Sequence, residues 1–334
     1  NCELSAIITN VYYMLYNNLR GVLAMNIKKT VLSLALAAIG CFTSLAGTAN
    51  AAESNFVTAD WIDQEIKTAC KTQTTKYSIL VRDLKTGEEA YLNPMRQRSA
   101  SLIKVYIMGE AYQLKKEGKL DFNEQVIIHK EDQKAWGSLD KVPAGTKVTV
   151  RQLIEQMIVV SDNTATNLLI DKIGYDRVNG FIKNIGCTDT VLGRKMLDSA
   201  AAKAGRDNWT SPKDMAHFYE LLYQGKLVDS KSDKEMIGIL CRQQWNERIP
   251  GNLPHDLRIA HKTGELGNAI HDCGIIFGRN RDYVLCIMTA DVPDENRGYD
   301  DNNALVFNDM ALISKLIWNK IDDPVLSQSG VNYY

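Results

Sequence analysis

Three short segments of this sequence contain residues that could carry out acyl transfer. The first is Ser101-Leu102-Ile103-Lys104, at the start of an expected helix. Positions i and i+3 share one face of a helix, so the Ser101 hydroxyl and the Lys104 amine can meet. Ser101 also lies in the first turn, where the helix dipole favours an alkoxide or an oxyanion. Lys104 could act as a base only if burial or a nearby cation lowers its pKa.

The other two segments are Ser161-Asp162-Asn163, between two expected helices, and Lys262-Thr263-Gly264, at the end of an expected strand. Gly264 would let the backbone of a substrate lie against the strand edge, and Lys262 supplies a second cation. Each motif alone is weak: another Ser-x-x-Lys, Ser138 to Lys141, lies in a loop and is interpreted as a solvated turn. All three motifs in order, each on the required element, predict a site for acyl transfer with a serine nucleophile and a lysine base.

The pattern of apolar residues predicts the elements that position these motifs. Strands at both ends of the chain and helices between them predict the α+β class in three layers (α/β/α). We expect an antiparallel sheet of about five strands, built from both termini and flanked by helices, with an inserted all-helical lobe and a cleft where the two parts meet. Helices are expected over 57–70, about 101–116, 150–159, 164–173, 175–185, 212–223, 233–242 and 303–321, and strands over 76–82, 88–92, 258–262, 273–277 and 283–290.

Length and composition are those of one large globular domain or two ordinary ones. The chain has 334 residues, of which 45% are hydrophobic and 24% charged, with a net charge of −1, which excludes fibrous and disordered classes and makes nucleic acid an unexpected partner. We expect an α/β part over 52–100 and about 211–322, a helical lobe over about 101–210, and a loose tail over 323–334. The histidines are scattered without zinc spacing, so we expect no metal and no other cofactor. We also expect a monomer.

The N-terminal part has the pattern of an export signal. A cationic start at Met25–Lys29 precedes the apolar run Val31–Ile39 and then Ala49-x-Ala51, which predicts a signal peptide over 25–51, cleaved after about Ala51. Residues 1–24 do not fit this plan and are interpreted as a mis-assigned upstream extension. Two alternatives stay open, a lipid anchor at Cys41 and an uncleaved span over 30–52. We therefore expect an exported protein, in the periplasm, at the cell envelope or outside the cell.

The part after the expected cleavage point retains an odd number of cysteines. At least one thiol must then be free or paired between chains. Two of them, Cys273 and Cys286, lie in apolar runs typical of neighbouring strands, where we expect buried thiols. The five cysteines are Cys70, Cys187, Cys241, Cys273 and Cys286.

The three motifs and their surroundings resemble those of class A β-lactamases, in the superfamily of penicillin-recognising serine β-lactamases and D,D-peptidases. The likeness covers essentially all of 54–322 and includes the runs Val159–Leu169 and Ile259–Glu265. It implies an antiparallel sheet flanked by helices, with a helical lobe beside it. It also implies a small-molecule β-lactam or a peptidoglycan peptide as substrate.

The resemblance further implies roles for single residues. Ser101 would be the acylated nucleophile and Lys104 its general base, while Ser161 would relay the proton to the leaving nitrogen. Arg248 matches an arginine that assists Lys262 in some members, and it equally fits a surface salt bridge. The remaining implied contacts are Asn163 for the amide side chain of the substrate, Lys262 and Thr263 for its carboxylate, the backbone N–H groups of Ser101 and Glu265 for the oxyanion hole, and Trp136 at the cleft mouth.

One departure from the family concerns deacylation. Class A β-lactamases carry a Glu in the loop after the helical lobe, where it activates the deacylating water, whereas the matching stretch Leu192–Ala201 has none. Asp198 is the nearest carboxylate and therefore the candidate for this role, since Asp207 fits a structural Arg–Asp pair. The prediction is an exported serine β-lactamase that is active in the antibiotic response. It would open the β-lactam amide through an acyl-enzyme on Ser101, and its deacylation is doubtful without this Glu. The alternatives are a D,D-peptidase or transpeptidase acting on peptidoglycan stem peptides, and a penicillin sensor that stays acylated.

Overall fold

The computed structural model describes residues 56–72, 74–293 and 305–322. The expected extension over 1–24, the signal peptide over 25–51, Cys41, and the tail over 323–334 all lie outside the described residues. Within the described ranges, none of the helices combines the length and the hydrophobicity that a bilayer span requires.

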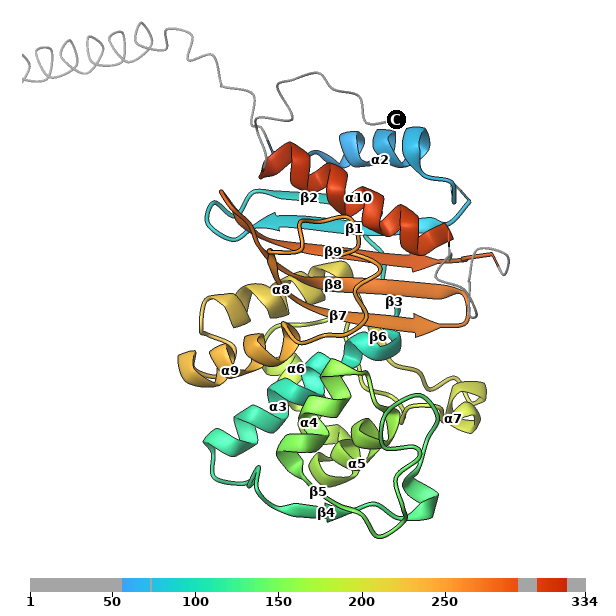
Figure 1. The fold of residues 1–334 in the computed structure, drawn as a ribbon, viewed down its shortest axis with the longest axis vertical. Coiled ribbons are helices and arrows are strands. Elements are labelled where there is room, and N and C mark those ends of the chain that lie inside the picture. The colour runs from blue at the N-terminus through green and yellow to red at the C-terminus, as the bar shows by residue number, and fades with distance from the viewer. Residues whose placement is uncertain (1–55, 73, 294–304, 323–334) are drawn as a thin grey trace, which may run out of the picture. The chain divides into compact units, whose positions relative to one another are not determined.

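Five strands form one antiparallel sheet in the order β2-β1-β9-β8-β7 (Figure 1). Lys76 of β1 lies opposite Ala290 of β9, so a strand from the beginning of the chain pairs with one from its end. The prediction of a single antiparallel sheet built from both termini is confirmed. The strands are β1 (Lys76–Asp83), β2 (Glu89–Leu92), β7 (Arg258–Leu266), β8 (Ala269–Phe277) and β9 (Asp282–Ala290).

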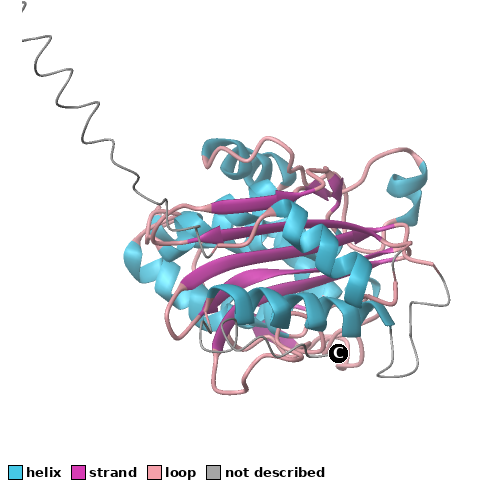
Figure 2. Ribbon diagram, turned by 90° about the horizontal axis from the view of Figure 1, so that it is seen from above, coloured by secondary structure: helices cyan, strands magenta, loops and turns pink. Residues whose placement is uncertain are grey.

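Helices cover both faces of this sheet (Figure 2). On one face, α2 (Ala59–Ala69) packs beside α10 (Leu305–Ile321), and on the other lies α8 (Pro212–Tyr223). Because successive side chains of a strand point to opposite faces, β9 supplies both cores. Leu285 and its alternate neighbours pack with α2 and α10, whereas Cys286 and its alternate neighbours pack with α8. The three-layer α/β/α arrangement is therefore as predicted.

The lobe beside the sheet is mainly helical. Its long helices bury an apolar core that is continuous with the α8 side of the sheet. Short strands that the sequence did not predict pair within and beside the lobe, so the lobe is not all-helical; each is only two or three residues long, too short for alternation to show. The elements are β3 (Gln97–Arg98), α3 (Lys104–Lys116), β4 (Gln125–Ile127), β5 (Lys147–Thr149), α4 (Val150–Val159), α5 (Asn163–Ile173), α6 (Tyr175–Asn184), α7 (Ser199–Lys203), β6 (Trp209–Thr210) and α9 (Ser230–Leu240), with 3-10 turns at Ala100–Ile103 and Lys130–Asp132.

The cysteines of the described ranges are all free thiols. Cys273 and Cys286 lie opposite each other on β8 and β9, and both are fully buried. Burial raises the pKa of Cys273 well above its usual value, which keeps it protonated and unreactive. The prediction of buried thiols in neighbouring strands is confirmed.

Candidate active site

Ser101 lies in a sharp turn between the sheet and the lobe. The expected helix from about 101 is in fact a 3-10 turn over Ala100–Ile103 followed by α3 from Lys104. Ala100 has a φ of 46°, a left-handed conformation that is uncommon for a residue with a side chain. The turn packs against β7, where a Cβ on Gly264 would lie 3.2 Å from the backbone nitrogen of Ser101. A side chain at this position would therefore press on the Ser101 turn, which favours glycine here.

Lys104 is fully buried one helical turn beyond Ser101 and is surrounded by acceptors. Its Nζ donates to the backbone oxygen of Ser161 at 2.6 Å, to Ser161 Oγ at 3.1 Å and to Asn163 Oδ1 at 3.0 Å. Burial lowers the pKa of Lys104 to about 7, and the charge of Asp162 opposes this shift. A substantial fraction of the lysine is therefore neutral at neutral pH and able to accept a proton. Ser101 is half-buried, and its hydroxyl has no hydrogen-bond partner among the described residues.

Ser161 links two buried lysines. Its Oγ accepts from Lys104 and also from Lys262 Nζ at 3.0 Å, while Lys262 donates to the backbone oxygen of Thr263 at 2.9 Å. Burial, and then the charges of Lys104 and Arg248, lower the pKa of Lys262 well below its usual value. Ser161 has a φ of 59°, a conformation that costs about 1–3 kcal/mol in a non-glycine residue. This backbone places one hydroxyl between two amines, which is the geometry of a proton relay.

The Ser161 turn is stabilised by the buried carboxylate of Asp162. This carboxylate caps α5 by accepting from the N–H of Ala165 at 2.7 Å, and it accepts from the N–H of Leu139 at 2.8 Å. Asn163 donates to the backbone oxygen of Ala135 at 2.9 Å, so the loop over 135–139 is attached to the turn at two points. Trp136 of this loop is 68% exposed, which leaves a large aromatic ring in solvent beside the lysine cluster.

The Lys262-Thr263-Gly264 motif lies in the middle of β7 and not at a strand end. The sequence prediction ended this strand at Lys262, but the ladder to β8 continues to Leu266, before the turn at Gly267. The prediction was wrong because the polar motif interrupts the apolar run without interrupting the backbone ladder. Since β7 is an edge strand of the sheet, its outer backbone edge faces the Ser101 turn.

Arg248 is buried and lies close to this motif. Its Nη2 is 2.5 Å from Glu265 Oε1, and its guanidinium carbon is 4.3 Å from the ring centroid of Phe307. Arg248 does form a salt bridge, but the interpretation that this salt bridge lies at the surface is wrong, because the arginine side chain is only 5% exposed. Its charge also lowers the pKa of Lys262, which shows that it acts on the same site electrostatically.

The sequence analysis missed a buried pair on β7 and β8, next to Lys262 in the sequence of β7. His261 Nδ1 lies 2.9 Å from Asp272 Oδ1, and Asp272 Oδ2 accepts from the N–H of Ile249 at 3.1 Å. Asp272 is fully buried and so connects β7, β8 and the segment that carries Arg248. The available signal was the presence of a histidine and an aspartate inside otherwise apolar strand segments.

The loop over 192–208 is closed by polar contacts. Arg194 Nε donates to Asp207 Oδ1 at 2.8 Å, so the structural Arg–Asp pair expected for Asp207 is formed with Arg194. The side chain of Asn167 holds Met196, donating to its oxygen at 3.1 Å and accepting from its N–H at 2.7 Å. Asn163 and Asn167 are one turn apart on α5, so the loop passes one turn from the lysine cluster.

The structure does not bring Asp198 to the lysine cluster. Its carboxylate caps α7 by accepting from the N–H of Ala201 at 2.9 Å. Among the described residues, no hydrogen bond or ion pair joins this carboxylate to Lys104, Ser161 or Lys262. The described residues contain no group of three or more His, Cys, Asp or Glu side chains that could hold a metal ion.

Comparisons with known proteins identify the family. A model described as the Beta-lactamase enzyme family matches residues 61–321. The chain belongs to this family. The resemblance to penicillin-recognising serine β-lactamases is thereby confirmed.

Relatives in the β-lactamase family are distant. Beta-lactamase BRO-1 of Moraxella catarrhalis is 25% identical over 211 residues, which cover 61% of this chain and 66% of that protein. Extended-spectrum beta-lactamase PER-1 of Pseudomonas aeruginosa is 28% identical over 195 residues, which cover 54% of this chain and 63% of that protein. The matched part therefore spans slightly less than two thirds of these curated relatives.

Solved structures share the fold over a longer range. The β-lactamase from Sphaerobacter thermophilus superimposes with a TM-score of 0.71 at 26% identity, covering 78% of this chain and 95% of that one. PBP-A superimposes with a TM-score of 0.67 at 23% identity, covering 77% of this chain and 94% of that one, and shows the common fold.

Proposed function

We propose that this protein is a serine hydrolase that opens the amide bond of β-lactams through an acyl-enzyme on Ser101. The observation that carries the proposal is the state of Lys104, a buried amine with a pKa of about 7 on the turn of helix after Ser101. Membership of the β-lactamase family and the β-lactamase names of the relatives support the substrate class. The predicted signal peptide supports export.

Acylation follows from the arrangement of the two lysines and Ser161. Neutral Lys104 takes the proton of the Ser101 hydroxyl as Oγ attacks the lactam carbonyl carbon. The oxyanion accepts from the backbone N–H groups of Ser101 and Glu265 on the adjacent strand. The proton then passes from Lys104 through Ser161 Oγ to the ring nitrogen as the C–N bond breaks. The net result is transfer of the serine proton to the leaving nitrogen.

The groups around the Ser161 hydroxyl would bind the substrate. A carboxylate on the substrate would pair with Lys262 and Thr263, with the buried charge of Arg248 behind them. Such an anion would raise the pKa of Lys262 and keep it protonated. Asn163 would hold an amide of the substrate, and Trp136 would cover it at the mouth of the cleft.

We propose that deacylation is slow. Asn167 of α5 holds the loop backbone at Met196, and the carboxylate of Asp198 is used to cap α7. Hydrolysis of the ester then lacks a carboxylate base for the water, and Lys104 alone must orient it. Among the structural neighbours, a mutant of PBP-A was solved as an acyl-enzyme complex with penicillin-G.

The second candidate function is a D,D-peptidase or transpeptidase acting on peptidoglycan stem peptides. It would use the same residues on an ordinary peptide bond. The missing carboxylate favours the transpeptidase, because transfer of the acyl group to an amine does not need an activated water. A sensor that stays acylated is the third. These alternatives differ from a β-lactamase in the lifetime of the acyl-enzyme.

A mass-spectrometric time course with benzylpenicillin tests the proposal. We expect a penicilloyl adduct on Ser101 that persists for minutes, and no adduct in Ser101→Ala. Ser138→Ala, which removes the serine of the second Ser-x-x-Lys, is the matched control and should label normally. Asp198→Asn should leave the adduct lifetime unchanged.

The outcomes separate the candidates. Decay within seconds with accumulation of product would show a fast β-lactamase and contradict slow deacylation. A stable adduct that a stem-peptide amine resolves would favour the transpeptidase. Absence of any adduct, or labelling of Ser101→Ala, would contradict the acyl-Ser101 mechanism itself.

A further inference from the structure

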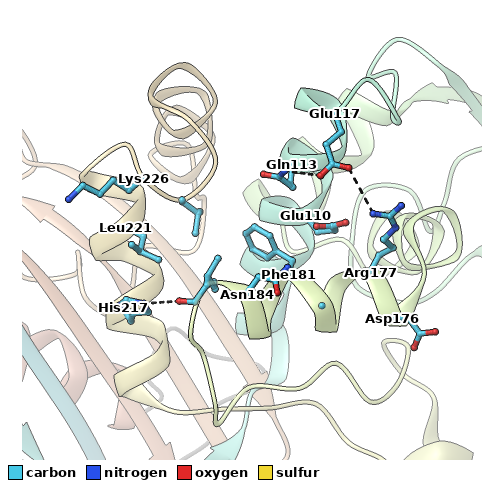
Figure 3. A pocket seen from close by; sticks show the side chains of 13 residues that line it. Glu110, Gln113, Glu117, Asp176, Arg177, Phe181, Asn184, His217, Leu221 and Lys226 are labelled. Atoms are coloured by element: carbon cyan, nitrogen blue, oxygen red, sulfur yellow. Dashed lines mark hydrogen bonds and ion pairs between the residues drawn. The ribbon is translucent and has the colours of Figure 1, made fainter.

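A second pocket lies between three helices of the described part (Figure 3). It is formed by the second half of α3, by α6, by α8 and by the segment that follows α8, and its volume is about 530 Å³. This volume is typical of sites for small organic molecules. None of its lining residues belongs to the cluster around Ser101. Its apolar wall consists of Phe181, Ile185, Leu221 and Leu227.

The pocket contains a largely buried glutamate whose carboxylate has no hydrogen bond or ion pair within the described residues. Glu110 of α3 is only 4% exposed, and it has no hydrogen bond or ion pair to any residue in the described part of the chain. Glu117, one of the other acids of the pocket, is in contrast bonded to Gln113 at 2.8 Å and to Lys119 at 2.7 Å. The oxygens of Glu110 are not among the fully buried atoms without a partner, so they face the open pocket. A group of this kind beside an open pocket indicates a ligand of opposite charge.

Two glycines shape the pocket. A Cβ on Gly109 of α3 would lie 2.6 Å from the ring of Phe181, so this ring rests directly on the α3 backbone. A Cβ on Gly180 of α6, which lines the pocket, would have no atom within 4 Å. Glycine inside a helix costs about 1 kcal/mol relative to alanine, and no contact in the described residues requires it at position 180. Gly180 therefore leaves space open that any side chain would occupy.

The charges around the pocket favour a cationic ligand. Arg177 already lies 3.9 Å from Glu117, and Lys226 donates to Gln224 at 3.0 Å. Both of these bases are exposed, so they are solvated and are weak attractors for an anion. Glu110 is the buried charge of the pocket, and it is negative.

We propose that this pocket binds a small organic cation, with an ammonium or amidinium group on Glu110 and an aromatic or aliphatic body against Phe181, Ile185 and Leu221. The site is separate from the catalytic cluster, because Glu110 lies six residues beyond Lys104 on the same helix. It does not depend on the proposed hydrolase activity.

Binding of a cation should depend on pH in a defined direction. Burial raises the pKa of Glu110 to about 7, and the charge of Arg177 opposes this shift. Since the cation binds the carboxylate form, its affinity should rise by about tenfold per pH unit below 7 and level off above it. The other charged or titratable groups around Glu110 are Asp176 and Arg177 on α6, Glu117 and Lys119 at and after the end of α3, His217 on α8, and Lys226 after α8. His217→Gln removes the histidine of the pocket, and the pH dependence of this variant then reports on Glu110.

Isothermal titration of the full chain with benzylamine, and with the neutral isostere benzyl alcohol, tests this site. At pH 8 we expect benzylamine to bind roughly tenfold tighter than benzyl alcohol. Glu110→Gln should reduce benzylamine binding to the level of the alcohol. Asp176→Asn, which neutralises an exposed acid of the same pocket, is the matched control and should have little effect. Gly180→Leu should fill the pocket and abolish binding of both compounds.

Several results would overturn the proposal. These are the absence of benzylamine binding at millimolar concentrations, equal affinities for the amine and the alcohol, or undiminished benzylamine binding in Glu110→Gln or Gly180→Leu. Ser101→Ala should bind benzylamine as the unmodified protein does, whether or not penicillin labels Ser101. Loss of binding in that variant would place the cation in the catalytic cleft and would contradict a separate site.

Discussion

The beginning and the middle of α3 bury ionisable side chains in contrasting ways. Lys104 at the beginning donates three hydrogen bonds, whereas Glu110, two turns later, has no partner among the described residues. Burial lowers the pKa of the lysine to about 7 and raises the pKa of the glutamate to about 7. Since burial disfavours the charged form of either group, one physical cause leaves both partly ionised near neutral pH.

The difference shows that a shifted pKa does not by itself identify a catalytic group. The partners of Lys104 fix its amine beside the hydroxyl of Ser161, so that a proton can move to a defined atom. Glu110 faces a pocket instead, where nothing in the described structure receives its proton. Geometry therefore assigns Lys104 to proton transfer and Glu110 to binding.

The largest expected effect is at the Lys104 end. Lys104→Ala should slow acylation by benzylpenicillin by about a hundredfold or more, because it removes the base. In the unmodified protein the acylation rate should rise with pH and reach half its maximum at about pH 7, where Lys104 loses its proton. Rapid-quench mass spectrometry measures both. Lys115→Ala, on the same helix but paired with Glu235 at the surface, should acylate normally. A pH-independent acylation rate would remove Lys104 from the role of base.

Two substitutions at Ser161 separate the effect of its hydroxyl on acylation from the effect of its backbone conformation on stability. Both Ser161→Ala and Ser161→Gly remove the bridge between Lys104 and Lys262, so each should slow acylation by roughly a hundredfold. Glycine accepts the φ of 59° without strain, so the glycine variant should be more stable than the alanine variant by about 1 kcal/mol. Thermal unfolding and acylation kinetics measure the two effects. Normal acylation in either variant would contradict a relay through this hydroxyl.

The smallest expected effect is that of Glu110 on stability. The pKa of Glu110 is raised in the folded protein, so the folded state binds more protons than the unfolded state between its ordinary value and about 7. The cost of burying the carboxylate therefore grows as pH rises through this range. Glu110→Gln should melt a few degrees higher than the unmodified protein at pH 8 and about equally at pH 4, which calorimetry can measure.

Glu117→Gln is the matched control for that measurement. Hydrogen bonds from Gln113 and Lys119 lower the pKa of this exposed glutamate, so its replacement should not raise the melting temperature at pH 8. Equal melting temperatures of Glu110→Gln and the unmodified protein at pH 8 would show that Glu110 already has a partner in solution.

Apolar periodicity predicted the long elements well. The limits of α4 and α8 agree with the prediction, because both helices have a clear apolar face and a cap, Thr149 and Ser211 respectively. The predicted start of α9 is Asp233, but the helix begins three residues earlier, at Ser230, with Asp229 as its cap. Two aspartates four positions apart are equivalent as caps in the sequence, and only the surrounding packing decides between them.

The site could be predicted where its residues are close in sequence. Spacing within motifs places Ser101 near Lys104 and Ser161 near Asn163, whereas their approach to Lys262 came from the resemblance. The contact of Asp272 with His261 depends on how β7 pairs with β8, which local spacing does not determine. Asp198 was a candidate because of its position along the chain, while the packing of its loop on α5 determines where it lies.

The pairing of β1 with β9 has a consequence for how the chain folds during its synthesis. β1 and β2 emerge early, yet a two-stranded hairpin is at best marginally stable in water, and the partner β9 ends more than 200 residues later at Ala290. The contacts of the helical lobe are more local, so the lobe can form before β9 is synthesised and pairs with β1. A ribosome that stops before β9 would release a folded lobe with an unpaired strand edge, a species prone to aggregation and to proteolysis.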